Sequence, residues 1–138
     1  MKKWNVLAGG VTLAVVLALS PVGAQDNKAP TIKQVMKKLN SGPNSVTATI
    51  GKELQDDPPV WDDIKKETQE YVKLVDALGK NDPPKGEKES WTKLSKDYVE
   101  NAKALDDATQ KKDKKAAVAA HKKITSTCMA CHAEHRKK

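Results

Sequence analysis

Two cysteines and a histidine stand close together near the end of the 138-residue chain. Cys128, Cys131 and His132 form the pattern C-x-x-C-H. On a helix these are positions i, i+3 and i+4, so the three side chains project from one face. This pattern is typical of haem attachment, in which the two thiols bond to the haem and the imidazole is an axial ligand of its iron. The motif therefore predicts one covalently attached haem c.

Other uses of a cysteine pair fit this sequence less well. A zinc site usually takes four ligands in two separated pairs, and the chain has one pair. A thioredoxin-like redox motif belongs near a βαβ pattern, which is absent here. A disulfide between residues three apart on one helix would be strained.

The second axial ligand decides what such a haem can do. A thioether sulfur is a good ligand for haem iron and raises its reduction potential. Of the three methionines, Met1 would be removed with the signal peptide expected over residues 1–24, and Met129 lies inside the motif and cannot reach the opposite face of the haem. Met36 is therefore the only candidate sulfur. The alternative is that Met36 is a core residue, which is the usual meaning of methionine on an apolar helix face.

The remaining side chains near the motif have weaker claims on the iron. His135 follows His132 by three residues and so lies on the same side of the haem. His121 lies eleven residues before His132, about 16 Å along the helix, and is expected to be a core or groove histidine. Arg136 lies one turn beyond His132, where it either hydrogen-bonds a haem propionate or remains a solvated charge.

The elements that must position these residues are helices. Apolar residues recur at helical spacing, and no stretch alternates as a strand would. The expected helices cover about 31–40, broken at 40–43 and resuming to residue 54, then 59–78, 87–109 and 114–136. Short connectors between them predict an all-α, antiparallel four-helix bundle with covalently attached haem c. In this topology Met36 and His132 lie at the same end and at nearly the same height.

The first residues have the pattern of a secretory signal peptide. Lys2 and Lys3 precede an apolar stretch over 6–19, and Val22-Gly23-Ala24 has the small residues of a cleavage site. The stretch is shorter than the ~20 residues that span a bilayer. We therefore expect a signal peptide over 1–24, one domain over 25–138, and a periplasmic protein without stable membrane insertion; the alternative is an uncleaved anchor.

The charge of the chain bears on which kinds of molecule it would bind. The formal net charge is +7, to which the two leader lysines contribute. Because acids and bases are mixed along the chain, the charges indicate solvated helix surfaces and no nucleic-acid binding. The small basic excess would steer the protein toward acidic redox partner proteins. A homodimer is an open alternative to a monomer.

Taken together, a signal peptide, a four-helix bundle and C-x-x-C-H in the last turns of the last helix resemble the cytochrome c-prime family, the class II c-type cytochromes. The segment Cys131-His132-Ala133-Glu134-His135-Arg136 is similar to the family's C-H-x-x-[YH]-R ending. Ile32-Lys33-Gln34-Val35-Met36-Lys37 resembles the first helix of low-spin members, in which a methionine is the sixth ligand. Trp91 resembles a tryptophan that opens the third helix.

The chain departs from this family at two places. Many members have an arginine near the haem propionates in the first helix, and none stands between Thr31 and Asn40; Lys33, Lys37 or Lys38 are the substitutes. His121 stands where an aromatic core residue is common.

Three functions follow from these observations. The first is a single-electron carrier in which Met36 and His132 hold the iron six-coordinate. The second is a five-coordinate protein that binds nitric oxide or carbon monoxide, with Met36 beside an open distal face. An enzyme such as a peroxidase ranks last, because the first helix has no histidine-arginine pair to cleave a peroxide bond.

Overall fold

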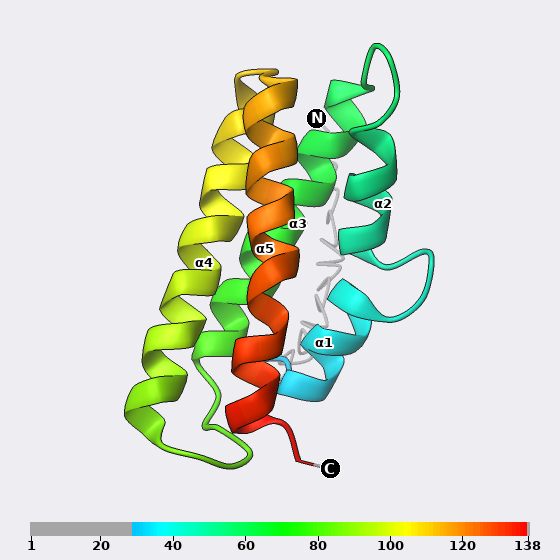
Figure 1. Ribbon diagram of the computed structural model, residues 1–138. Coiled ribbons are helices and arrows are strands. Elements are labelled where there is room, and N and C mark those ends of the chain that lie inside the picture. Colours follow the sequence, from blue (N-terminus) through cyan, green and yellow to red (C-terminus); the bar gives the residue numbers. More distant parts are fainter. Residues whose placement is uncertain (1–28, 138) are drawn as a thin grey trace, which may run out of the picture.

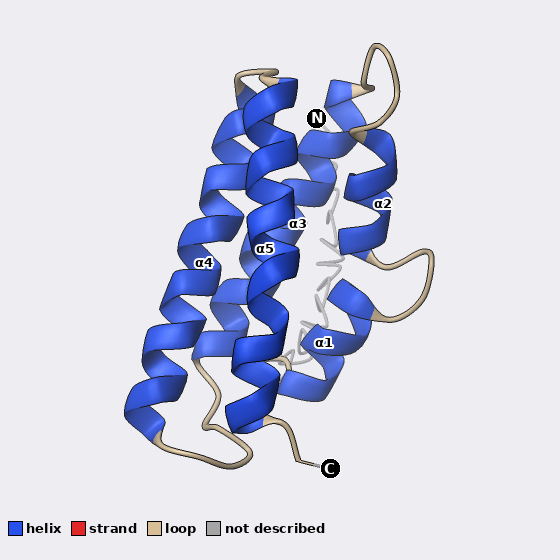
Figure 2. Ribbon diagram, viewed as in Figure 1, coloured by secondary structure: helices blue, strands red, loops and turns tan. Residues whose placement is uncertain are grey.

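The computed structural model describes residues 29–137, and the expected signal peptide over 1–24 lies outside them. The described part contains five helices: α1 (Ile32–Asn40), α2 (Val46–Glu53), α3 (Trp61–Gly79), α4 (Lys88–Gln110) and α5 (Lys114–His135). No strand occurs between residues 29 and 137, which confirms the predicted all-helical fold (Figure 2). None of these helices is long and apolar enough to cross a membrane.

The helices form a bundle with four sides (Figure 1). The long helices α3, α4 and α5 make three sides, and α1 and α2 follow one another along the fourth. Successive sides run in opposite directions, so α1 and the C-terminal end of α5 lie at the same end of the molecule, as the sequence predicts. This topology places Met36 and the C-x-x-C-H motif at one end.

Local signals explain why α1 is short. Thr31 caps the start of this helix. Its hydroxyl accepts a hydrogen bond from the backbone N–H of Gln34 at 3.3 Å, and the side-chain oxygen of Gln34 accepts one from the backbone N–H of Thr31 at 2.8 Å. The helix ends before Gly42, whose φ of +82° suits glycine and no other residue well. Pro43 then prevents the helix from continuing. The chain therefore turns between α1 and α2 at the predicted break.

The helices enclose one apolar core, to which all five contribute. Its buried members are Val35, Leu39, Val46, Ile50, Leu54, Ile64, Tyr71, Val75, Leu78, Trp91, Ala102, Leu105, Ala108, Ala117 and Ile124. Only two of these belong to α5, and beyond Ile124 the sole buried residue of that helix is His135. The last turns of α5, which carry the motif, are therefore largely outside this core.

Candidate functional site

Helix α5 presents the three motif residues on one face. Cys128, Cys131 and His132 are all half-buried and line the same cavity. Met129, between the two cysteines, is 75 % exposed and so lies on the other side of the helix. Both cysteines are free thiols. The structure therefore bears out the helical spacing on which the motif argument depends.

The space in front of this face lies between two helices, α1 and α5, whose backbones do not approach closely. No Cα atom of α1 comes within 8 Å of a Cα atom of α5 among the described residues, although α2 packs against α5 and α1 packs against α3. Two cavities lie along this separation, of about 110 Å³ and about 940 Å³. Both are lined by Met36, Asn40, Trp91, Cys131 and His132. Met36 and His132 therefore face common space, as their predicted heights in the bundle require.

The smaller cavity is mainly apolar. Besides the five shared residues it is lined by Leu78, Leu94, Ser95, Asp97, Tyr98, Thr127, Cys128 and Ala130. A mainly apolar cavity with a few convergent polar groups is the usual form of a cofactor site.

The larger cavity is bordered by positive charge. Lys33 and Lys37 of α1 and Arg136 and Lys137 after α5 line it, and no acidic residue does so. Lys38, the third lysine suggested for the missing arginine, instead pairs with Glu70 of α3 and lines neither cavity. The structure thus brings Arg136 to the same space as Lys33 and Lys37, where an anionic group would be stabilised.

The surroundings of the two thiols favour their protonated form over the thiolate. Burial raises the pKa of the Cys128 thiol. Burial also raises the pKa of Cys131, and the neighbouring Cys128 and Glu134 add to the shift. Reactive and redox-active cysteines have lowered pKa values, because the thiolate is the nucleophile. The environment of this pair therefore disfavours a thiol redox motif.

His135 has a structural place that its position in the sequence does not reveal. It is 2 % exposed, and its Nδ1 lies 2.8 Å from the Lys85 carbonyl oxygen in the loop between α3 and α4. Its ring meets that of Trp91 edge to face, with centroids 5.3 Å apart. The Trp91 indole N–H in turn donates to the carbonyl of Asn81 in the same loop, at 2.8 Å. His135 and Trp91 therefore hold this loop against the end of α5.

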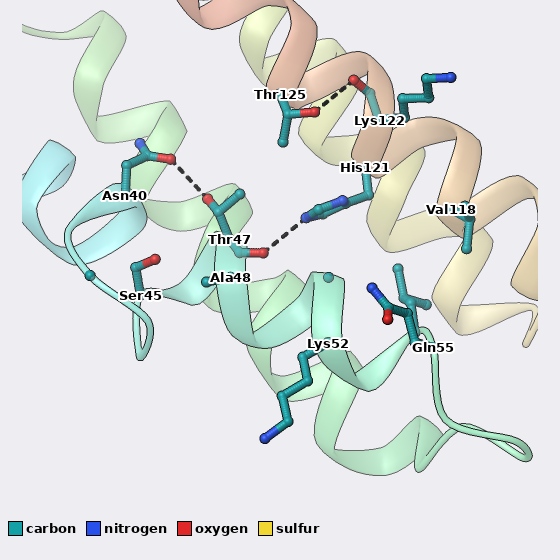
Figure 3. Close-up of a pocket in the computed structure, with 13 residues that line it drawn as sticks. Asn40, Ser45, Thr47, Ala48, Lys52, Gln55, Val118, His121, Lys122 and Thr125 are labelled. Atoms are coloured by element: carbon teal, nitrogen blue, oxygen red, sulfur yellow. Dashed lines mark hydrogen bonds between the residues drawn. The ribbon is translucent and has the colours of Figure 1, made fainter.

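His121 lies at a separate cavity, of about 690 Å³, between α2 and α5 (Figure 3). Its Nε2 is 2.9 Å from the Thr47 carbonyl oxygen, and its ring lies against Gly51. The expectation of a groove histidine is confirmed by this hydrogen bond. His121 lines neither cavity beside the motif.

Polar side chains next to Met36 form contacts that the sequence does not predict. The Asn40 amide nitrogen lies 3.7 Å from the Met36 sulfur, and the Asn40 oxygen accepts from the Thr47 hydroxyl at 3.0 Å (Figure 3). The only signal in the sequence is that Asn40 follows Met36 by four residues, which is one helical turn.

Among residues 29–137, no group of three or more histidine, cysteine, aspartate or glutamate residues is placed to hold a metal ion. Comparisons of the chain with models of protein families, with curated proteins and with solved structures found no match.

Proposed function

We propose that the chain is a c-type cytochrome of the cytochrome c-prime type, an exported, periplasmic single-electron carrier. In this proposal Cys128 and Cys131 would attach one haem c, and His132 and Met36 would bind its iron. The observation that carries it is the cavity space between α1 and α5, which the C-x-x-C-H face lines from one helix and Met36 lines from the other. The antiparallel four-helix bundle is the architecture that brings α1 and the end of α5 to the same end of the molecule.

The residues around this space fit a haem in chemistry. Two neighbouring thiols match two vinyl groups, and an imidazole and a thioether match the two axial positions of the iron. Apolar side chains such as Leu78 and Leu94 match the porphyrin faces. Lys33, Lys37 and Arg136 match the two propionates at the edge. The donor set suits zinc less well, since zinc prefers four ligands in a closed site.

In electron transfer, the side chains of this site would bind the haem and exclude water from it. Bound haem supplies a reversible one-electron change at its iron. His132 and Met36 would hold the iron in both oxidation states, so that little rearrangement of these side chains would accompany the transfer. The apolar lining excludes water, which helps to set the potential. No proton transfer or substrate position is needed, so we propose no enzymatic activity. Redox partner proteins would exchange the electron.

A five-coordinate, gas-binding cytochrome is the second candidate. Met36 is half-buried at the wall of the cavity of about 940 Å³ and is not enclosed in the core. An exogenous nitric oxide or carbon monoxide molecule would then have room beside it.

Replacing Met36 by leucine separates these two functions. Because leucine keeps the apolar volume, the change should lower the free energy of unfolding by less than about 1.5 kcal/mol. If Met36 is the sixth ligand, the variant should change from low-spin to high-spin, bind carbon monoxide more readily and have a lower reduction potential. Optical spectra of both oxidation states, carbon monoxide titration and potentiometry measure these changes.

Met129→Leu is the matched control, because Met129 is exposed beside the motif. It should leave the spectra and the potential unchanged. A wild-type protein that is already high-spin, with a spectrum that Met36→Leu does not alter, would contradict electron transfer by a six-coordinate haem and favour gas binding.

A further inference from the structure

A chain of hydrogen bonds runs from the interior of the bundle to the Met36 sulfur. The Tyr98 hydroxyl of α4 lies 2.6 Å from that of Tyr71 of α3, and the Tyr71 hydroxyl lies 3.4 Å from that of Thr47 of α2. Thr47 is 3.0 Å from the Asn40 oxygen, and the Asn40 nitrogen is 3.7 Å from the Met36 sulfur. Four helices therefore contribute to one polar path that ends at the proposed iron ligand.

The protons of this path have a preferred direction. Thr47 has one hydroxyl proton and two acceptors within reach, the Asn40 oxygen at 3.0 Å and the Tyr71 oxygen at 3.4 Å, and the shorter contact is the one with Asn40. With its oxygen occupied by Thr47, Asn40 turns its NH₂ group toward the Met36 sulfur. The reversed amide would place an oxygen against a sulfur, where neither atom can donate. The contacts therefore make Asn40 a donor to Met36.

The middle of the path is buried, whereas Tyr98 at its other end is half-buried and lines the smaller cavity together with Met36 and Asn40. Tyr71 is 1 % exposed and Thr47 is 9 % exposed. Burial raises the pKa of Tyr71. Burial also raises the pKa of Tyr98, and the neighbouring Tyr71 adds to that shift. Both phenols therefore keep their protons near neutral pH and remain able to donate.

Thr47 is itself held in place by α5. Its carbonyl oxygen lies 2.9 Å from His121 Nε2, so the residue that orients Asn40 is attached to the helix that carries the haem motif (Figure 3). Asn40 is exposed at the cavity wall, and the hydrogen bond from Thr47 holds the oxygen of its amide.

We propose that Asn40 is a positioning residue for the Met36 sulfur and that Thr47 orients it. This inference rests on the proposed function, in which Met36 binds iron. A thioether sulfur has two lone pairs, so it can bind iron with one and accept the Asn40 N–H with the other. The N–H holds the sulfur in one orientation and withdraws electron density from it. A poorer electron donor favours ferrous over ferric iron, so Asn40 raises the reduction potential.

Two replacements test this role on the haem-loaded protein. Asn40→Leu removes the donor and keeps similar volume, while Thr47→Val removes the hydroxyl that orients the amide. Both should shift the potential downward, with the larger shift in Asn40→Leu, and should shift the sulfur-to-iron charge-transfer band. Loss of one hydrogen bond should also raise the apparent affinity for carbon monoxide by roughly fivefold, because the sulfur is released more easily. Thr47→Ser keeps the hydroxyl and should restore all three readouts.

The outcomes distinguish this inference from the function on which it rests. If wild type is low-spin and six-coordinate but Asn40→Leu leaves the potential, the band and the carbon monoxide affinity unchanged, the role of Asn40 is refuted and the proposed function stands. If Thr47→Ser behaves as Thr47→Val, the orienting role of the Thr47 hydroxyl is refuted and the proposed function again stands. If wild type is high-spin, Met36 does not bind iron, and both the electron-carrier function and the role of Asn40 are refuted.

Discussion

His132 and His135 are three residues apart on α5, yet they lie in different surroundings and have different roles. His132 is half-buried at the wall of both cavities beside the motif. His135 is 2 % exposed, bonded to the Lys85 carbonyl and packed on Trp91. His135 therefore has a structural role, because one of its ring nitrogens already bonds a backbone carbonyl.

His135→Ala should therefore weaken the fold. The change leaves the Lys85 carbonyl without its partner and opens a cavity against Trp91, and these two effects should lower the free energy of unfolding by about 2–4 kcal/mol. Urea denaturation followed by circular dichroism measures it. Lys123→Ala, an exposed position on the same helix, should stay within about 0.5 kcal/mol of wild type. Equal stability of both variants would show that His135 does not hold the loop.

At the scale of elements, the contact between α2 and α5 depends on a glycine. A Cβ atom on Gly51 would lie 2.8 Å from His121 Cε1, so any larger residue displaces the imidazole. That displacement would break the bond between His121 and the Thr47 carbonyl. The close approach of these two helices is therefore set by the absence of a side chain at residue 51.

Gly51→Ala tests this contact through its dependence on His121. In a helix interior alanine is ordinarily better than glycine by about 1 kcal/mol. Here the clash should outweigh that gain and lower the free energy of unfolding by about 1 kcal/mol. In a His121→Ala background the clash is gone, and the same substitution should stabilise the fold by about 0.5–1 kcal/mol.

Gly79→Ala is the control for this cycle, because a Cβ there meets only ordinary contacts with Ser95. The change in the free energy of unfolding that Gly79→Ala causes should be the same with and without His121. If Gly51→Ala stabilised the protein equally with and without His121, the two helices would not be in the contact described.

The sequence predicts the helices well because their signals are local. Apolar spacing predicts every helix, and the break after Asn40 follows from Gly42 and Pro43. The helix expected from residue 59 begins at Trp61, since the first helical hydrogen bonds in this region are those accepted by the Val60 carbonyl.

Contacts between distant residues carry no comparable signal. The pairing of His121 with Thr47 joins residues 74 positions apart, and that of His135 with Lys85 joins residues 50 apart. The bond between Asn40 and Thr47 depends on the angle at which the chain leaves α1, which periodicity does not determine. The motif and Met36 were therefore predictable as candidates, whereas the residues that position them required the structure.

For the whole molecule, the main feature is the separation of α1 from α5. The other neighbouring helices pack directly, whereas between these two lie the cavities lined by Met36 and His132. A haem in this space would complete the core at this end of the bundle and stabilise the fold by binding to it. The fold and the cofactor would then depend on one another.

The most direct test is the mass of the chain after denaturation. Protein produced in a host with haem-attachment machinery is denatured and extracted with acid acetone, and the mass of the intact polypeptide is measured. We expect the mass of the polypeptide plus one haem. The variant with Cys128→Ala and Cys131→Ala should have the bare mass and a lower melting temperature. A wild-type chain that gives up all its haem on extraction, or carries none while a control c-type cytochrome from the same host is fully loaded, would contradict covalent attachment.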